Sequence, residues 1–270
     1  MEDGGRVLVL SAEEGMVSHM ARGECVIGVR SGSDLPPLPG GCYLVDEEES
    51  VDAVFADRVY ARFRNKPWKI GENDTVLLRE FSVDDIRELY LLEQEMQAYP
   101  AVSGILGELA DTPWEGLPAD VREALTAKLS SYIEHQYAFY EYGLWGIYLR
   151  SEDRLIGMCG FSVTEEGVPS LGYYVSPAYR RRGIATQCCR MALDFVENWV
   201  QTEEVSADID RENFASLCIV RALGFVEMKG DGQRLQFRKT LAGDKTDPDS
   251  PEAGALWNKI LSAAGKQFRR

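Results

Sequence analysis

The chain has 270 residues, of which 45% are hydrophobic and 27% are charged, and its formal net charge at pH 7 is −15. No apolar run is long enough to span a bilayer, so we expect a folded cytoplasmic protein with no membrane partner. The negative charge would repel a phosphate backbone, which excludes nucleic acid as a partner for the chain as a whole. It favours a cationic small molecule or peptide instead.

The cysteine and histidine pattern argues against a metal centre. Six cysteines show no CxxC pair and no metal-ligand spacing, and His19 and His135 are the only two histidines. A zinc site or a disulfide framework would need such spacing. The sequence therefore predicts no metal site and reduced, mostly buried thiols.

Residues 1–72 alternate strand-like and helix-like patterns. Strand patterns stand at Arg6–Ser11, Cys25–Arg30 and Cys42–Asp46, and helical patterns at Ala12–Gly23 and Val51–Arg64. This alternation predicts a small parallel sheet in a Rossmann-like α/β half-domain. The Gly- and Pro-rich run 31–41 is predicted to connect two of these elements.

A second unit, residues 73–242, is predicted to begin in the loop Gly71–Thr75. A strand at Val76–Phe81 precedes Ser82, the predicted N-cap of a helix over 83–96. An irregular segment rich in glycine and proline then leads to a long amphipathic helix over 119–142.

The rest of this unit is predicted to be a strand meander followed by alternating helices and strands. Strand patterns at 144–150, 155–163 and 170–176 indicate antiparallel hairpins. They are followed by a helix at 185–200, a strand at 205–209, a helix at 214–223 and strands at 225–230 and 234–241. Residues 243–270 are predicted to be a polar linker and an amphipathic helix that starts near Ser250 and Pro251.

The turn after the third meander strand, PAYRRRGIATQCC from Pro177 to Cys189, collects three arginines in an acidic chain. Gly183 allows the backbone to approach a ligand closely, and the next helix points its free N–H groups back toward the turn. Together with the arginines, these groups could bind a diphosphate. An exposed basic turn without a ligand is the alternative on this segment alone.

Two linked motifs give the turn a context. The run Arg180-Arg181-Arg182-Gly183-Ile184-Ala185 matches the Q/R-x-x-G-x-G/A signature of the GNAT superfamily of acyl-CoA-dependent N-acyltransferases. Downstream, Asn213-x-x-Ser216 opens a helix that closes on Leu223-Gly224-Phe225, which resembles the second CoA-contacting segment of that family. The order of elements from Thr75 to Leu241 is also similar. The resemblance implies an α/β fold with a mixed central sheet, the α+β GNAT fold.

The resemblance further implies acetyl-CoA as the cofactor and assigns its contacts by position. The main chain of Tyr174, Val175 and Ser176 would pair with the pantetheine amides like an added strand. Asn213 would contact pantetheine and Ser216 the cofactor nearby, although Asn213 could also serve as a helix N-cap. The pyrophosphate would be surrounded by Arg180, Arg181, Arg182, Gly183, Ile184, Ala185 and Thr186.

Acetyl transfer to an amine needs an unprotonated nucleophile, stabilisation of an oxyanion, and a proton source for the thiolate. In the family, a backbone N–H near the end of the third meander strand, here near Val175, stabilises the oxyanion. The family's acid is often a tyrosine four residues before the Gly-Phe pair, and this chain has Val220 there. A glutamate often found on the third strand is also missing, because Ser170 and Leu171 stand in its place.

The base and the acid must therefore come from other residues. Tyr173, Asp208 and Glu166 are the candidate catalytic residues, with Glu165 and Asp210 as further carboxylates on the expected acceptor side. A solvated surface carboxylate is the alternative for each acid, and a chain of water molecules could carry the proton. The aromatic residues Tyr132, Phe139 and Tyr140 could line the acceptor pocket or pack in the core.

The sequence thus predicts an N-acetyltransferase that transfers the acetyl group of acetyl-CoA to an amine of a small molecule or peptide by direct attack in a ternary complex. A non-catalytic CoA or acyl-CoA sensor is the alternative, motivated by Val220 and the absent glutamate. A structural or interaction protein is a third reading. The identity of the acceptor and the oligomeric state, a homodimer included, are left open.

The segment Val7–Val29 resembles a fragment of the haloacid dehalogenase superfamily. Ser11 and Ala12 stand where that family has acids, so phosphoryl transfer would lack its carboxylate nucleophile and its metal site. The resemblance implies a catalytically empty unit that serves as a docking surface, a dimer interface or a ligand sensor.

Overall fold

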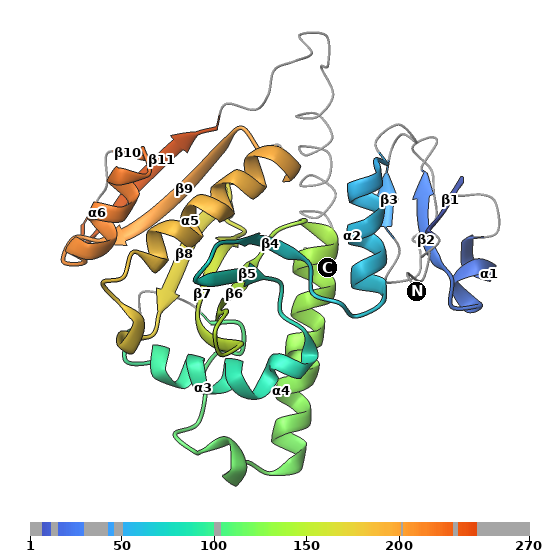
Figure 1. The fold of residues 1–270 in the computed structure, drawn as a ribbon, viewed down its shortest axis with the longest axis horizontal. Coiled ribbons are helices and arrows are strands. Elements are labelled where there is room, and N and C mark those ends of the chain that lie inside the picture. Colours follow the sequence, from blue (N-terminus) through green and yellow to red (C-terminus); the bar gives the residue numbers. More distant parts are fainter. Residues whose placement is uncertain are drawn as a thin grey trace.

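The computed structural model describes residues 7–11, 16–29, 43–45, 51–99, 104–200, 202–228 and 232–241. These residues form one sheet of three strands and one of eight (Figure 1). The predicted connection 31–41, the start of the predicted helix 12–23 and the terminal segment 243–270 lie outside the described residues.

The smaller sheet is parallel, as the alternation of elements predicts. Its strands lie in the order β1 (Val7–Ser11), β2 (Cys25–Val29) and β3 (Tyr43–Val45). Helix α1 (Met16–Ala21) lies between β1 and β2 in the chain, and α2 (Ala53–Phe63) follows β3. Asp52 caps α2 by accepting a hydrogen bond from the N–H of Phe55 at 2.7 Å. The small core of this unit contains Cys25, Ile27 and Val59.

The larger sheet is mixed and has the strand order β10-β11-β9-β8-β7-β6-β5-β4. All neighbours are antiparallel except β8 and β9, which run parallel. This arrangement confirms the predicted α/β fold with a mixed central sheet. The strands are β4 (Lys69–Glu72), β5 (Val76–Arg79), β6 (Leu144–Leu149), β7 (Arg154–Ser162), β8 (Ser170–Val175), β9 (Glu204–Asp210), β10 (Val226–Glu227) and β11 (Arg234–Thr240).

Strand β4 has no counterpart among the predicted elements. It is a four-residue edge strand that pairs with β5, and it contains Gly71, which weakens any strand pattern. A Cβ on Gly71 would come within 2.9 Å of Met191 in the helix above, so the glycine lets that helix approach the sheet. The larger sheet therefore begins at Lys69, before the predicted division between residues 72 and 73.

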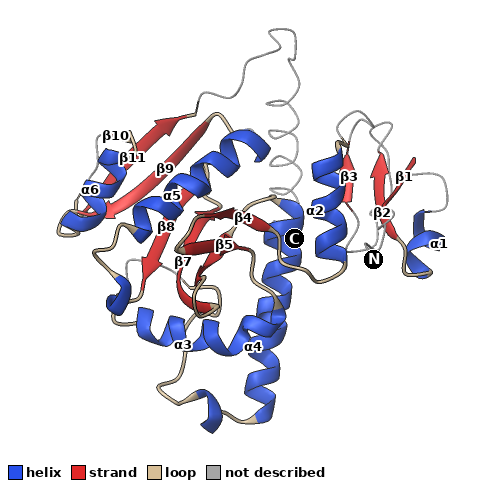
Figure 2. Cartoon of the chain, in the orientation of Figure 1, coloured by secondary structure: helices blue, strands red, loops and turns tan. Residues whose placement is uncertain are grey.

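Helices cover both faces of the larger sheet (Figure 2). On one face, which we call the α3/α4 face, α3 (Ile86–Met96) and α4 (Ala119–Tyr132) bury Leu89 and Leu129 against Met158 and Tyr174. On the other, the α5/α6 face, α5 (Ile184–Phe195) and α6 (Phe214–Ala222) pack on the inward residues of β7, β8 and β9. Alternate residues of each strand therefore face different helices.

Single helical turns mark several element ends. Ser82 stands before the 3₁₀ turn Val83–Asp85 that opens α3, and its N–H donates to the carboxylate of Asp85 at 2.7 Å. Further 3₁₀ turns lie at Trp114–Gly116 and Pro177–Tyr179. The capping position predicted for Ser82 is thus confirmed.

Both long predicted helices continue as π-helical turns, at Ile133–Tyr137 after α4 and at Val196–Val200 after α5. The hydroxyl of Tyr132 accepts the N–H of Leu144 at 2.6 Å, and the hydroxyl of Tyr137 donates to the carbonyl of Leu144 at 2.6 Å. These bonds fix the helix end to the start of β6. Tyr132 therefore packs in the core, and Phe139 is exposed.

Buried charges join α2 to the larger unit, beside which it lies in Figure 1. The guanidinium of Arg62 pairs with Glu80 at 2.6 Å and with Glu141 at 2.9 Å, and Arg58 pairs with Glu141 at 2.6 Å. Arg62 also donates to the hydroxyl of Tyr43 at 3.2 Å. We call these five residues the inter-unit cluster. The side chains of Arg58, Arg62 and Glu80 are 4%, 7% and 2% exposed, so the cluster is shielded from water.

The thiols of Cys159, Cys188 and Cys189 are buried in the core and that of Cys218 is exposed, while Cys42 lies outside the described residues. Within the described part of the chain, no three His, Cys, Asp or Glu residues are grouped so that they could hold a metal ion. No helix among the described elements has the length and apolar character needed to cross a membrane.

Candidate active site

The larger sheet opens between β8 and β9. These parallel strands are paired at Ser170 and Ser206, where the N–H of Ser206 also donates to the carbonyl of Pro169 at 2.9 Å. Beyond this pair the described strands diverge, although parallel strands ordinarily bond along their whole length. We call the opening between residues 171–175 and 207–210 the wedge. It leaves one main-chain edge of β8 without a strand partner in the described structure.

A cleft of about 950 Å³ occupies the wedge. All predicted cofactor residues except Ser176 and Arg182 line it, although they come from a strand, a turn and two helices. The lining residues are Ala98, Tyr99, Tyr173, Tyr174, Val175, Tyr179, Arg180, Arg181, Gly183, Ile184, Ala185, Thr186, Asp210, Glu212, Asn213, Ala215, Ser216, Ile219 and Arg234.

The N-terminus of α5 lies at this cleft. Gly183 is its N-cap and has φ 75°, a left-handed conformation that favours glycine. The buried residues Cys188, Cys189 and Ala192 hold the helix against the sheet. Free N–H groups at a fixed helix N-terminus attract anions, so the turn has the geometry of a phosphate site.

Asn213 caps α6, because its side-chain oxygen accepts the N–H of Ser216 at 3.1 Å. The capping role that the sequence allows is therefore observed. Both residues also line the cleft, so the cap leaves them on its wall.

The three arginines of the turn differ in their surroundings. Arg180 donates from Nε to the carbonyl of Val175 at 2.7 Å, and its guanidinium carbon lies 4.4 Å from the centroid of the Tyr99 ring. Arg182 donates to the carbonyl of Ala178 at 3.1 Å and does not line the cleft. A hydrogen bond and a cation–π contact thus hold Arg180 at the end of β8.

The two tyrosines of β8 point to opposite faces of the sheet. Tyr173 lies on the α5/α6 face and donates from its hydroxyl to the carbonyl of Ser216 at 3.4 Å. Burial raises the pKa of Tyr173, so its hydroxyl keeps its proton at neutral pH. Tyr174 lies on the α3/α4 face, where its hydroxyl donates to Glu95 at 2.7 Å.

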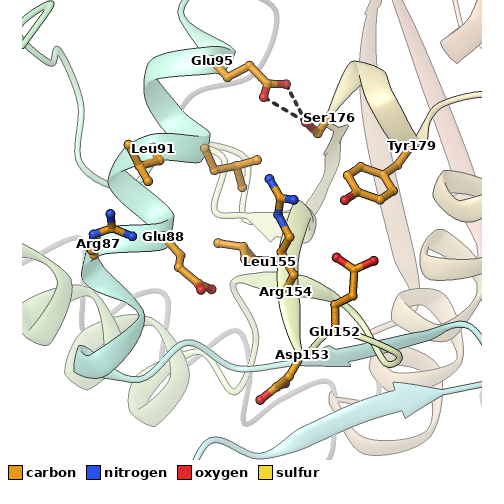
Figure 3. A pocket seen from close by; sticks show the side chains of 11 residues that line it. Arg87, Glu88, Leu91, Glu95, Glu152, Asp153, Arg154, Leu155, Ser176 and Tyr179 are labelled. Carbon is orange, nitrogen blue, oxygen red and sulfur yellow. Dashed lines mark hydrogen bonds between the residues drawn. The ribbon is translucent and has the colours of Figure 1, made fainter. Parts of the chain in front are cut away.

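Glu95 belongs to a second pocket, of about 470 Å³, between α3 and the β6–β7 turn (Figure 3). Its carboxylate accepts the hydroxyl of Ser176 at 2.8 Å, and Tyr179 lines both this pocket and the cleft. Neither Glu95 nor Tyr99 is among the predicted site residues, because their approach to β8 depends on how α3 packs. A glutamate near the end of a predicted helix does not by itself indicate a functional site.

The predicted carboxylates lie in different surroundings. Asp208 is half-buried on the α3/α4 face, because its neighbours Ala207 and Ile209 are buried on the α5/α6 face. Asp210 shares the face of Asp208 and lines the cleft. Glu166 pairs with Arg238 and has a side chain that is 67% exposed, and Glu165 is exposed in the same turn. Neither glutamate lines the cleft, and neither does Asp208.

Comparison with known proteins places the larger unit in a family context. A family model described as an acetyltransferase (GNAT) domain matches residues 75–226. The probable N-acetyltransferase YjcK of Bacillus subtilis (strain 168) is 26% identical over 84 residues, which are 30% of this chain. The match spans 46% of that relative, so less than half of its length is compared.

Two solved structures share the fold. RimL, a ribosomal L7/L12 alpha-N-protein acetyltransferase in complex with coenzyme A, has a TM-score of 0.52 and 16% identity, and the match covers 66% of this chain and 100% of that one. The ribosomal-protein-S5-alanine acetyltransferase from Vibrio fischeri has a TM-score of 0.50 and 16% identity, with 67% and 100% covered.

These matches bear on the alternatives left open by the sequence. The family model and the named relatives are all acetyltransferases, which does not favour a non-catalytic sensor. The family match leaves residues 1–74 outside, and neither the Rossmann-like description nor the haloacid dehalogenase resemblance of the N-terminal segment is confirmed.

Proposed function

This chain belongs to the GNAT acetyltransferase family, and we propose that it acetylates an amine by direct attack within a ternary complex. Enzymes of this family take the acetyl group from acetyl-CoA. The acceptor is proposed to be a small molecule or a peptide. The observation that carries the proposal is the cleft in the wedge. Residues of both family motifs line this cleft, beside the edge of β8 that has no strand partner in the described structure.

The described residues fit the cofactor. The open edge of β8 at Tyr174, Val175 and Ser176 would hold the pantetheine amides, and residues 180–186 would hold the pyrophosphate at the α5 N-terminus. Asn213 and Ser216 would contact it from α6. Bound acetyl-CoA supplies an activated thioester, and the protein supplies orientation and proton transfer.

The register of β8 and β9 supports roles for two polar side chains beside the wedge, those of Asp208 and Tyr173. Asp208 lies two residues beyond Ser206 and Gly172 two beyond Ser170, so both occupy the same level on the α3/α4 face. Tyr173 lies next to Gly172 but on the α5/α6 face. An amine that enters from the α3/α4 face would thus meet a carboxylate, and a thiolate that leaves toward α6 would meet a hydroxyl.

The proposed reaction uses Asp208 and Tyr173 on opposite faces of the sheet. Asp208 attracts the ammonium form of the acceptor and takes a proton from its nitrogen. The free amine would then form a bond to the acetyl carbon, the main chain near Val175 would stabilise the oxyanion, and the carbon–sulfur bond would break as the nitrogen loses its second proton to water. Tyr173 donates its proton to the sulfur and so replaces the tyrosine that Val220 excludes from α6.

Initial-rate kinetics test the function. We expect thiol release from acetyl-CoA with at least one of alaninamide, spermidine and a tetrapeptide with a free N-terminus, because the carboxylates of Asp208 and Asp210 lie on the α3/α4 face of β9 and would attract a cationic amine. Reciprocal plots should intersect, and intact-mass spectra of the enzyme incubated with acetyl-CoA should show no added acetyl group. Parallel plots or an acetylated enzyme would contradict direct attack, and a lack of coenzyme A binding in calorimetry would contradict the function.

Variants at the two faces separate the roles of acid and base. Tyr173→Phe should lower kcat about 100-fold without changing the dissociation constant of coenzyme A, because the ring remains and only the proton donor is lost.

Asp208→Asn should lower the rate most at neutral pH. The rate of this variant should recover as the pH rises, since free amine then forms without a base. Glu166→Gln, a surface carboxylate in the same acidic chain, is the matched control and should leave the pH profile unchanged. If Asp208→Asn had the same pH–rate profile as the wild-type enzyme, Asp208 would not be the base.

A further inference from the structure

Gly172 stands inside β8, directly beside the wedge. A glycine weakens a strand interior, and where it occurs it often marks a bulge, a bend or a place where another backbone or a ligand comes close. These causes can be distinguished by the atoms that a Cβ would contact if it were built on each glycine of the meander.

Packing explains three other strand glycines of β6 and β7. A Cβ on Gly146 would come closer than 3.0 Å to the rings of Tyr148 and Phe81. On Gly157 and Gly160 it would come equally close to the carbonyl oxygens of Tyr174 and Gly143. These three positions require glycine because the protein itself fills the space.

Gly172 has no such close neighbour among the described residues. The nearest heavy atom to a Cβ built there is Cδ2 of Leu144, at 3.9 Å, an ordinary contact distance. Its φ lies outside the left-handed region, and it pairs in regular register with Gly160 of β7. Neither the backbone conformation nor the packing of the described residues therefore requires glycine at this position.

The room for a Cβ at Gly172 lies on the face from which the acceptor is proposed to enter. Leu144 and Tyr174 both belong to the core of the α3/α4 face, so the missing side chain of Gly172 would point to that face. Asp208 occupies the same level on the neighbouring strand. The cofactor would bind along the edge of β8 instead of above its face, so the space over Gly172 is separate from the cofactor's path.

We infer that Gly172 determines acceptor specificity, because its missing side chain leaves room for the carbon that carries the reacting amine. This inference rests on the proposed function and deepens it. The room matters most for an amine on a substituted carbon, as in an amino acid amide or a peptide N-terminus. It matters least for methylamine, which needs no space beside the nitrogen.

Calorimetry on Gly172→Val tests this without requiring turnover. The probes are coenzyme A and a bisubstrate compound in which the coenzyme A sulfur is joined through a CH₂–CO bridge to the amine of alaninamide. The variant should bind coenzyme A within twofold of the wild-type affinity and the alaninamide compound at least tenfold more weakly. A compound made with methylamine should lose less affinity, and Gly172→Ala should give an intermediate loss.

The stability of the variants provides the control. Gly172→Ala should melt at or above the wild-type temperature, whereas Gly160→Ala should melt lower because its Cβ would collide with a carbonyl oxygen. Unchanged affinity of Gly172→Val for the alaninamide compound would overturn the inference, and so would a parallel loss of coenzyme A binding. Failure of the wild-type protein to bind coenzyme A would instead overturn the proposed function.

Discussion

Gly183→Trp is expected to weaken coenzyme A binding at least 100-fold, a change of about 3 kcal/mol in binding free energy. Gly183 has φ 75° as the N-cap of α5, and a side chain there would strain the turn and project beside the N–H groups proposed to hold the pyrophosphate. A Cβ alone would not collide with the described residues, because its nearest neighbour is Gln187 at 3.5 Å, so the bulk of Trp would act on the ligand site and not on the core. Isothermal titration with coenzyme A measures the effect.

Gly23→Trp is the matched control for backbone strain. Gly23 has φ 73°, and a Cβ placed on it would have no described neighbour within 4 Å. It follows α1, which lies on the opposite side of the molecule from α5 and α6 (Figure 1). It should therefore suffer similar strain and keep wild-type affinity for coenzyme A. Wild-type affinity in both variants would show that the turn does not hold the cofactor. An equal loss of affinity in both variants would indicate a general effect on folding.

Local sequence patterns predict most of the elements that line the cleft. Ser82 followed by acids indicates a helix start, alternating residues indicate the meander, and Gly183 before an amphipathic run indicates the turn and α5. The cap of Asn213 was also within reach, since it depends on contacts three residues apart. Each of these features is set by neighbours in the chain, which is why a single sequence reveals them.

Features that depend on distant partners were not accessible in this way. The divergence of β8 from β9 follows from how two strands meet, and no residue of β8 encodes it alone. Glu95 reaches Tyr174 only because α3 packs across the sheet. The sequence could name Tyr173 and Asp208 as candidates, but it could not place them on opposite faces, because that requires the register at Ser170 and Ser206.

Arg62→Ala is expected to lower the free energy of unfolding by about 3–5 kcal/mol. The guanidinium of Arg62 bridges Glu80 and Glu141, and its loss would leave the carboxylate of Glu80, in a side chain that is 2% exposed, without its charged partner. Breaking a buried ion pair on one side is costly because the remaining charge stays out of water. Urea unfolding followed by circular dichroism measures the change.

Arg87→Ala is the matched control, since Arg87 pairs with Glu115 at 2.5 Å on the surface and should leave the urea midpoint unchanged. A small effect of Arg62→Ala would show that the inter-unit cluster contributes little to stability. A large effect has a further consequence, because α2 precedes the segment matched by the family model yet supplies charges that Glu80 of the larger unit needs. The acetyltransferase unit would then depend on α2 for its stability, and a chain cut after α2 would unfold more readily than the full chain.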